Sequence, residues 1–363
     1  MASIGRRQFT GVLAAAALAA PVLGDSPDVL RADDSGKKKP IRIGQIGVGH
    51  SHATKLAVYR QSPDYEVVGI AEPDPELRKR AAAISPYRDL PWLTRDQLLN
   101  VSGLQAVLVE TRVPDLLTAA EACIAAGKHV HLDKPAGESL PPFRRILEAA
   151  ARQKLLVQMG YMFRYNPAVV LLREFLKKGY LGKPFEVHAV MSKVVPPVDR
   201  RRMAWSRGGM MLELGSHLID LVVGLLGKPC QIHSFAEHVS PTDDGLLDNM
   251  LAVLRYPKTL ASVKSSALEV EGFERRHLVV CGTEGTFHIQ PLDNPSARVA
   301  LAKAQGGYRK GYQDVRFGKY ERYVADAADM ARILRGEKQA DFSYEHDLAV
   351  QETLLKASGL PCD

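Results

Sequence analysis

Residues 41–52 read Ile41-Arg42-Ile43-Gly44-Gln45-Ile46-Gly47-Val48-Gly49-His50-Ser51-His52, and no other segment constrains the fold as strongly. The run begins as an apolar strand, turns through Gly47 and Gly49, and continues into a helix-like segment over residues 53–59. A glycine-rich turn between a strand and a helix directs main-chain N–H groups and the positive helix end toward a pyrophosphate. The segment therefore predicts a dinucleotide-binding βαβ unit. A glycine-bearing βαβ unit without a cofactor is the alternative.

The dinucleotide fingerprint is incomplete, because His52 occupies the third glycine position, which normally permits close packing of helix on strand. A second predicted strand, residues 65–71, ends at Glu72, 23 residues after the second glycine. A carboxylate at this place can accept hydrogen bonds from an adenosine ribose. Since it would also repel a 2′-phosphate, Glu72 favours NAD, whereas Arg78 and Lys79 leave NADP open.

Predicted strands and helices alternate up to about residue 160, which indicates a parallel sheet covered on both faces. After the first two strands, the elements are expected over residues 104–110, 116–126, 129–132, 141–153 and 155–159. Ligands bind outside the carboxyl ends of such strands. The predicted fold class of this half, residues 41–164, is an α/β Rossmann domain with a doubly wound parallel sheet.

The pattern changes beyond Pro167 to short strands joined by tight turns, which indicates an open-faced, mostly antiparallel sheet. These strands are expected over residues 185–194, 231–238, 250–256, 260–268, 277–281 and 286–290. Helices are expected over residues 211–226, 320–334 and 347–358. The predicted second domain, residues 165–363, is of α+β type and serves substrate binding and oligomerisation. An open sheet suits face-to-face pairing of subunits, so a homodimer or homotetramer is expected.

The N-terminal segment is predicted to lie outside the fold. The pair Arg6-Arg7 precedes an apolar stretch over residues 11–20, which is typical of a twin-arginine signal and too short to span a bilayer. We predict a signal peptide over residues 1–24, a linker over residues 25–40, and export through the twin-arginine translocon to the periplasm or beyond. The mature chain is expected to have no integral membrane span. A surface amphipathic N-terminus and an uncleaved membrane tether are the alternatives.

Charge and cysteine content exclude other classes of protein. The net charge is +7, but the basic clusters at residues 37–39 and 200–202 are isolated and lack neighbouring aromatic residues, so no nucleic-acid partner is predicted. The four cysteines lie far apart, which fits neither a zinc knuckle nor a dense disulfide framework. Buried thiols are expected, and one disulfide in an exported protein is the alternative.

Two segments carry candidate catalytic residues. Lys134 ends a predicted strand at the cofactor edge, where its ammonium can ease deprotonation of a substrate hydroxyl; a surface lysine is the alternative. Glu213 and His217 are four residues apart on a predicted helix, so a carboxylate can fix the tautomer of a proton-accepting imidazole. An ordinary surface pair, or a zinc site that includes Asp220, are the alternatives. The His-x-x-x-His zinc spacing is missing, and no metal is predicted.

Softer candidates lie near the domain junction. Tyr161, Arg164 and Tyr165 follow the last predicted Rossmann strand and can meet a sugar hydroxyl or carboxylate, with aromatic packing as the alternative for the tyrosines. Lys193 and Trp205 are expected to border the pocket from the second domain. The histidines beside the phosphate turn, His50 and His52, are expected to support the site without binding a metal.

Three motifs together resemble the glucose–fructose oxidoreductase / inositol dehydrogenase / rhizopine catabolism family: Gly47-Val48-Gly49, Asp133-Lys134-Pro135 and Glu213-Leu214-Gly215-Ser216-His217. The resemblance covers residues 41 to about 358. It implies a Rossmann domain, an open-sheet domain, and oxidation or reduction of sugars and polyols with NAD or NADP. It also implies that Lys134 is the family's conserved lysine and His217 its catalytic histidine.

The chain departs from the family pattern at three places. Asp133 stands where the family usually has glutamate, and Glu213 where it usually has aspartate. Residues 113–118 lack the asparagine and histidine that many relatives carry there.

The chain is accordingly predicted to be an exported NAD(P)-dependent oxidoreductase acting on a sugar, sugar acid or cyclitol, with a tightly bound cofactor because free NAD is scarce outside the cytoplasm. The predicted catalytic residues are Lys134, His217 as general base, and Glu213 orienting His217. Substrate is assigned to Tyr161, Arg164, Lys134 and His217, and cofactor to Gly47, Val48, Gly49, His50, Ser51, Glu72, Thr111, Asp133 and Lys134. A glycoside hydrolase acting by transient oxidation and elimination, and a non-catalytic sugar-binding protein, are the alternatives.

Overall fold

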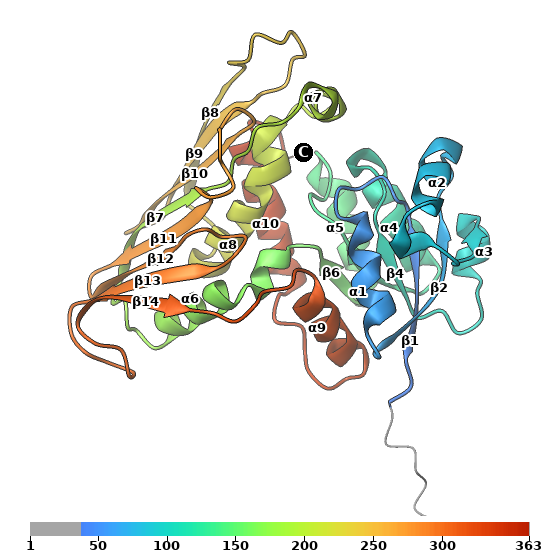
Figure 1. Ribbon diagram of the computed structural model, residues 1–363, viewed down its shortest axis with the longest axis horizontal. Coiled ribbons are helices and arrows are strands. Elements are labelled where there is room, and N and C mark those ends of the chain that lie inside the picture. Colours follow the sequence, from blue (N-terminus) through green and yellow to red (C-terminus); the bar gives the residue numbers. More distant parts are fainter. Residues whose placement is uncertain (1–37, 363) are drawn as a thin grey trace, which may run out of the picture. The chain divides into compact units, whose positions relative to one another are not determined.

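A six-stranded parallel sheet forms the first half of the computed structural model, which describes residues 38–362. The strand order is β3-β2-β1-β4-β5-β6, and every neighbouring pair is parallel (Figure 1). The strands are β1 Ile41–Ile46, β2 Tyr65–Ala71, β3 Trp92–Leu93, β4 Ala106–Val109, β5 His129–Leu132 and β6 Val157–Met159. The predicted signal peptide, and the predicted linker up to residue 37, lie outside the described residues.

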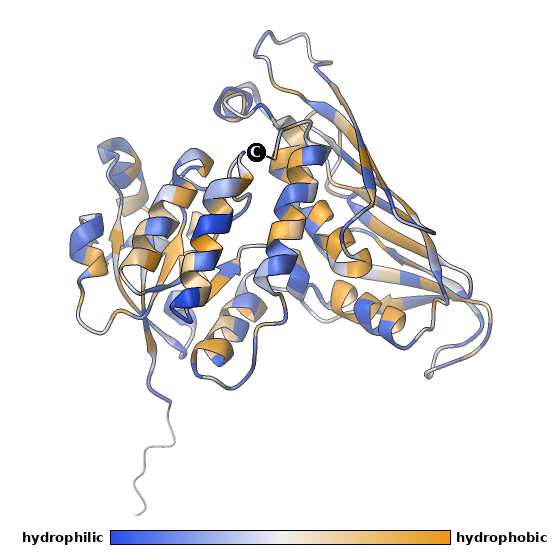
Figure 2. Cartoon of the chain, turned by 180° about the vertical axis from the view of Figure 1, so that it is seen from behind, coloured by the Kyte–Doolittle hydropathy of each residue, from blue (hydrophilic) through white to orange (hydrophobic). Residues whose placement is uncertain are grey.

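Helices cover both faces of this sheet, because crossovers between parallel strands pass over them. They are the 3-10 turn η1 Ala53–Lys55 and the helices α1 Leu56–Gln61, α2 Pro75–Ala82, α3 Arg95–Leu99, α4 Leu116–Ala125 and α5 Leu140–Arg152. Alternate residues of β4 enter two different apolar cores: Val107 packs with α4 and α5, whereas Leu108 packs with α1. Figure 2 shows these buried strands mainly in the hydrophobic colour. The predicted Rossmann fold is confirmed.

The second half contains an eight-stranded sheet with the order β14-β13-β12-β11-β7-β10-β9-β8. Only the pair β10–β7 is parallel, so the prediction of a mostly antiparallel sheet is confirmed. The strands are β7 Pro184–Val190, β8 Gln231–Glu237, β9 Asn249–Arg255, β10 Leu260–Ser266, β11 His277–Gly282, β12 Gly285–Ile289, β13 Ser296–Leu301 and β14 Gly311–Arg316.

One face of this second sheet is covered by helices, and the other is open (Figure 1). The covering helices are α6 Pro167–Lys177, α8 Ser216–Leu226 and α10 Tyr344–Ala357. The open face carries large apolar side chains, with Phe235 59%, Leu260 56% and Tyr312 70% exposed. A shorter helix, α7 Pro197–Met203, follows β7.

The long helix predicted over residues 211–226 begins differently in the structure. Met211–Gly215 form a π-helical turn, and the α-helix α8 starts only at Ser216. A π turn has a wider repeat than an α turn and is frequent at functional sites.

Helix α9, Val324–Leu334, returns to the first sheet (Figure 1). Its residues Met330 and Ala331 complete the core that contains α1, and the Tyr65 hydroxyl donates to the Ala327 carbonyl at 2.6 Å. A segment far along the chain therefore closes one face of the Rossmann sheet. None of the helices within residues 38–362 is long and apolar enough to cross a membrane.

Candidate functional site

The turn after β1 has the geometry of a phosphate-binding loop. Gly47 has a φ of +88°, and a Cβ atom there would lie 2.4 Å from the Thr111 nitrogen. Both facts require glycine, since other residues rarely adopt this conformation and no side chain fits the gap. The main chain of β1 can thus run against the Glu110–Thr111 turn and leave the loop open on its outer side.

The N–H groups of this loop divide into two kinds. The Val48 N–H donates to Glu72 Oε2 at 2.9 Å, and the His50 N–H donates to the Glu110 carbonyl at 3.0 Å. By contrast, no acceptor within residues 38–362 engages the N–H groups of Gly49 and Ser51. These two N–H groups fit a pyrophosphate, which needs donors that the fold has not already used.

Glu72 lies at the carboxyl end of β2 and is held by the main chain. Its Oε1 accepts from the Asp74 N–H at 2.9 Å, while Oε2 takes the Val48 N–H. Each oxygen keeps a lone pair for a ribose hydroxyl, so the fixed carboxylate fits the adenosine end of a dinucleotide.

A buried charge cluster lies beneath the loop and consists of Lys55, Glu110, His131 and Asp133, each at most 2% exposed. The Lys55 ammonium is 2.7 Å from Asp133 Oδ2, 3.0 Å from Glu110 Oε1 and 2.9 Å from His131 Nε2. Neither Glu110 oxygen has an aligned hydrogen-bond donor in the described chain, so the ammonium charge is its main compensation. The sequence did not mark Lys55, which resembles an ordinary helix lysine until the sheet places two carboxylates above it.

The pKa values of the two acids in the buried charge cluster are shifted in opposite directions. Burial raises the pKa of Glu110 well above its usual range, and neighbouring Asp133 adds to the effect. Burial also acts on Asp133, but His50, Lys55 and His52 outweigh it and hold the pKa of that carboxyl well below normal. The pair Lys55–Asp133 is therefore charged at neutral pH.

Two histidines of the loop contact Asp133 from above. His50 Nδ1 is 3.1 Å from Oδ2, and His52 Nδ1 is 3.1 Å from Oδ1. One nitrogen of each ring and a carboxylate oxygen lie within 4.8 Å of one another, which is close enough to hold a metal ion. The Lys55 ammonium already supplies positive charge at that carboxylate. Asp133 thus lies under the loop, with both oxygens engaged by the chain itself.

Lys134 reaches from the end of β5 to the π-helical turn of the second half. Its Nζ donates to the Glu213 carbonyl at 2.7 Å and lies 3.6 Å from Glu213 Oε1. Burial raises the pKa of Glu213, but Lys134, His50, His52 and Lys193 lower it more, so this carboxyl stays ionised. The structure brings the two predicted catalytic residues Lys134 and Glu213 into direct contact.

His217 is buried among aromatic rings and lacks the expected carboxylate. Its ring centroid is 5.2 Å from Phe163, 6.2 Å from Tyr161 and 5.8 Å from His52. Nδ1 has no hydrogen-bond partner among the described residues, and the Glu213 carboxylate lies beside Lys134. Burial, followed by the Lys134 charge, lowers the pKa of His217 well below normal and keeps the imidazole neutral.

The remaining candidates fall into different environments. Arg164 is 4% exposed, and its guanidinium is bound by two buried carboxylates, Asp220 at 2.6 Å and Asp347 at 2.6 Å. The N–H donors of the Arg164 guanidinium therefore bind carboxylates in the protein interior. Tyr161 is 2% exposed and packs edge-on to His217.

The other candidate residues near the domain junction differ in how they contact the site. The Tyr165 hydroxyl donates to Asp329, and Trp205 is 43% exposed. Lys193 is half-buried and close enough for its charge to act on Glu213. Tyr323, which the sequence did not indicate, has a φ of +70°; its ring centroid is 5.9 Å from His52 and 5.2 Å from the Lys55 ammonium.

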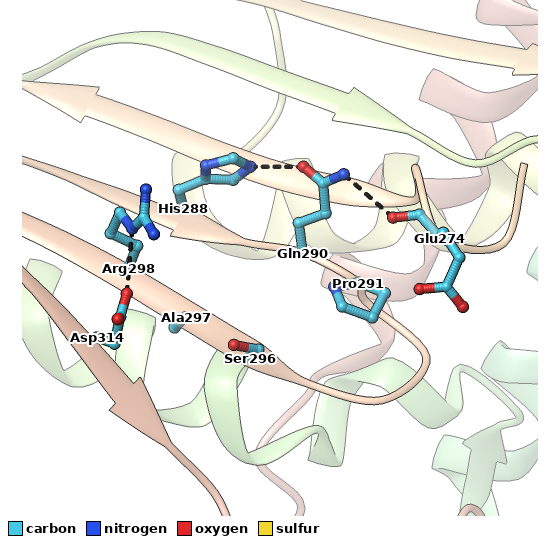
Figure 3. Close-up of a pocket in the computed structure, with 8 residues that line it drawn as sticks. All are labelled: Glu274, His288, Gln290, Pro291, Ser296, Ala297, Arg298 and Asp314. Carbon is cyan, nitrogen blue, oxygen red and sulfur yellow. Dashed lines mark hydrogen bonds and ion pairs between the residues drawn. The ribbon is translucent and has the colours of Figure 1, made fainter.

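A separate cavity of about 330 Å³ lies on the open face of the second sheet (Figure 3). It is lined by Glu274, His288, Gln290, Pro291, Ser296, Ala297, Arg298 and Asp314. Its Arg298–Asp314 ion pair, at 3.1 Å, is more than half exposed. None of the predicted site residues lines it, so this hollow belongs to the sheet surface.

Two family models match this chain, one in each half. The model described as the oxidoreductase family, NAD-binding Rossmann fold, matches residues 41–161. The model described as the GFO/IDH/MocA C-terminal domain matches residues 169–288. The phosphate loop, Glu72, Asp133 and Lys134 fall in the first match, and Glu213 and His217 fall in the second.

Relatives agree with this assignment. Myo-inositol 2-dehydrogenase of Thermotoga maritima is 26% identical over 278 residues, which cover 73% of this chain and 79% of that enzyme. Trans-1,2-dihydrobenzene-1,2-diol dehydrogenase of Macaca fuscata fuscata is 27% identical over 224 residues, 60% of this chain and 65% of that enzyme. The solved structure of UDP-N-acetylglucosamine 3-dehydrogenase from Acidithiobacillus ferrooxidans shares the fold, with a TM-score of 0.73 at 19% identity over 89% of this chain and 98% of that one. The chain therefore belongs to the Gfo/Idh/MocA family and is an NAD(P)-dependent oxidoreductase.

Proposed function

We propose that this protein transfers hydride between a CH–OH group of a sugar, sugar acid or cyclitol and NAD. The observation that carries the proposal is the contact of Lys134 with Glu213, because it joins the ammonium at the end of β5 to the helical segment that also carries the neutral imidazole of His217. Charged and neutral polar groups around one small site suit a polyhydroxylated substrate. The name of the Thermotoga maritima relative, a myo-inositol dehydrogenase, supports this substrate class.

The described residues fit a nicotinamide dinucleotide. Gly49 and Ser51 would donate their free N–H groups to the pyrophosphate, and Glu72 would accept from the adenosine ribose. The carboxylate of Glu72 supports NAD, because it disfavours a 2′-phosphate. When bound, the nicotinamide supplies the hydride acceptor or donor.

The side chains of the site handle the hydroxyl proton. The Lys134 ammonium favours the negative charge that develops on the substrate oxygen as its proton leaves. His217 stays uncharged and can accept a hydrogen bond or a proton, since burial opposes its imidazolium form. Glu213 holds Lys134 in place through its carbonyl and carboxylate.

We also propose that the protein is exported by the twin-arginine route with its cofactor already bound. The support is the Arg6-Arg7 pair before an apolar stretch. Tight binding would let one cofactor alternate between oxidised and reduced forms. Subunits would pair through the open sheet face, which exposes Phe235, Leu260 and Tyr312.

The experiment is ligand release from the full chain, followed by kinetics. Mass spectrometry of purified protein should detect NAD, and a panel of sugars and cyclitols should change the absorbance at 340 nm. Lys134→Ala should lower kcat by about 10²-fold or more with NAD still bound. An exposed control, Lys303→Ala, should change neither. Absence of NAD binding by calorimetry, or glycoside hydrolysis without any redox change in NAD, would refute the proposal.

A further inference from the structure

His52 has the side-chain partner that His217 lacks. Its Nδ1 lies 3.1 Å from Asp133 Oδ1, and Asp133 is fully buried and ionised. An ionised carboxylate can only accept hydrogen bonds, so His52 Nδ1 must carry the proton and Nε2 must present a lone pair. A carboxylate that fixes the tautomer in this way prepares an imidazole to accept a proton.

Asp133 is itself rigidly placed. Oδ1 also accepts the Lys134 N–H at 2.7 Å, and Oδ2 accepts the Lys55 ammonium at 2.7 Å. The shorter aspartate, at a position where the family usually has glutamate, thus holds His52, which stands at the third glycine position of the fingerprint. One departure from the family pattern, Asp133, and one from the dinucleotide fingerprint, His52, are therefore joined by one hydrogen bond.

His52 also faces the site. Its side chain is 15% exposed, and no residue within 38–362 hydrogen-bonds its Nε2. The groups around it are His50 and Lys134 from the first half, His217 from α8, and the Tyr323 ring. Burial lowers the pKa of His52 to about 4, although Asp133 raises it, so the free ring is uncharged at neutral pH.

We propose that His52, oriented by Asp133, is the residue that accepts the hydroxyl proton of the substrate, with His217 as its neighbour on the substrate oxygen. The inference rests on the proposed function. The carbinol O–H bond breaks and its proton bonds to His52 Nε2, while the C–H electron pair leaves as hydride to oxidised NAD and the carbon becomes a carbonyl. Asp133 acts as a positioning residue and keeps its charge throughout.

The first test needs no substrate. Nitrogen-15 NMR of histidine-labelled apo-protein should show His52 as the Nδ1–H tautomer, uncharged down to about pH 5. His52→Gln identifies the signal. An Nε2–H tautomer would overturn the proposal whether or not the enzyme proves active. Zinc chloride that shifts both His50 and His52 signals reversibly with a chelator would also overturn it, because a metal would then occupy these nitrogens.

The second test is kinetic and uses the holoenzyme. His52→Gln should lower kcat by about 10²- to 10⁴-fold, keep KM within about threefold, and abolish the acid limb of the pH–rate profile. His217→Gln should keep that limb. His188→Gln, on the open sheet face and about half exposed, is the matched control and should behave as wild type. Retention of the acid limb in His52→Gln would refute the proposal, whereas a wild-type protein that binds no NAD would refute the proposed function and leave the NMR result to decide the tautomer.

Discussion

The Lys55→Met substitution tests the buried charge cluster most directly. Methionine keeps the length of the side chain but removes the ammonium that lies 2.7 Å from Asp133 Oδ2 and 3.0 Å from Glu110 Oε1. All three groups are at most 2% exposed, so the range for broken buried pairs applies, about 3–5 kcal/mol, and not the 0–1 kcal/mol of surface pairs. At about 2 °C per kcal/mol for a chain of this size, Tm should fall by about 6–10 °C.

The loss of stability in Lys55→Met should also depend on pH. Without the ammonium, the folded-state pKa of Asp133 rises above its wild-type value, so the folded variant binds a proton more tightly than folded wild type does. The stability deficit of Lys55→Met against wild type should therefore grow as pH rises, until Asp133 of the variant is fully ionised. Urea unfolding followed by circular dichroism at several pH values measures both quantities. A loss at pH 7 no larger than that of the exposed control Lys303→Met, or one independent of pH, would refute the reasoning.

Three further predictions concern single residues. Gly47→Ala should weaken NAD binding at least tenfold by calorimetry, because its Cβ would lie 2.4 Å from the Thr111 nitrogen. The control Gly127→Ala, also at positive φ but without neighbours within 4 Å, should bind NAD normally. Equal affinities of the two variants would contradict the loop geometry. Glu72→Ala should raise NADP affinity relative to NAD by about tenfold, about 1.4 kcal/mol, whereas the exposed Glu76→Ala should leave the ratio unchanged. Burial raises the pKa of Asp326 to about 6, above its unfolded value, so this group destabilises the fold as pH rises from 4 to 7. Urea titrations should show that wild type loses about 2 kcal/mol relative to Asp326→Asn over this range, and parallel pH curves would contradict it.

Local pattern was sufficient to predict most of the fold. Strands β2 and β5 have the predicted bounds, since each is a short strand-like run followed at once by a charged residue, Glu72 or Asp133. Strands β13 and β14, next to and at one edge of the second sheet, were not predicted, because exposed polar residues such as Ser296, Arg298 and Asp314 interrupt their apolar pattern. Helix α6 was also missed, although Asn166 caps it by accepting from the Ala168 and Val169 N–H groups.

The site was less accessible to sequence reasoning, because its contacts join distant residues. The motifs indicated Lys134, Glu213 and His217, but the predicted pairing of Glu213 with His217 is wrong, because Glu213 contacts Lys134 and a π turn replaces the expected α-helix there. Lys55 meets its carboxylates only through the parallel order of β1, β4 and β5. Tyr323 lies far from His52 in the sequence, so no local sequence pattern predicts the contact between their rings.

The return of α9 to the Rossmann sheet affects how a nascent chain acquires its structure. The ribosome completes β6 about 170 residues before it reaches Met330 and Ala331, a delay of roughly 10–35 s at 5–20 residues per second. Throughout that interval the apolar surface formed by Ile43, Leu56 and Tyr59 lacks its cover. A chaperone that binds this patch would bridge the delay, and a truncation before residue 324 would leave the N-terminal half prone to aggregate even though every strand of its sheet had been translated.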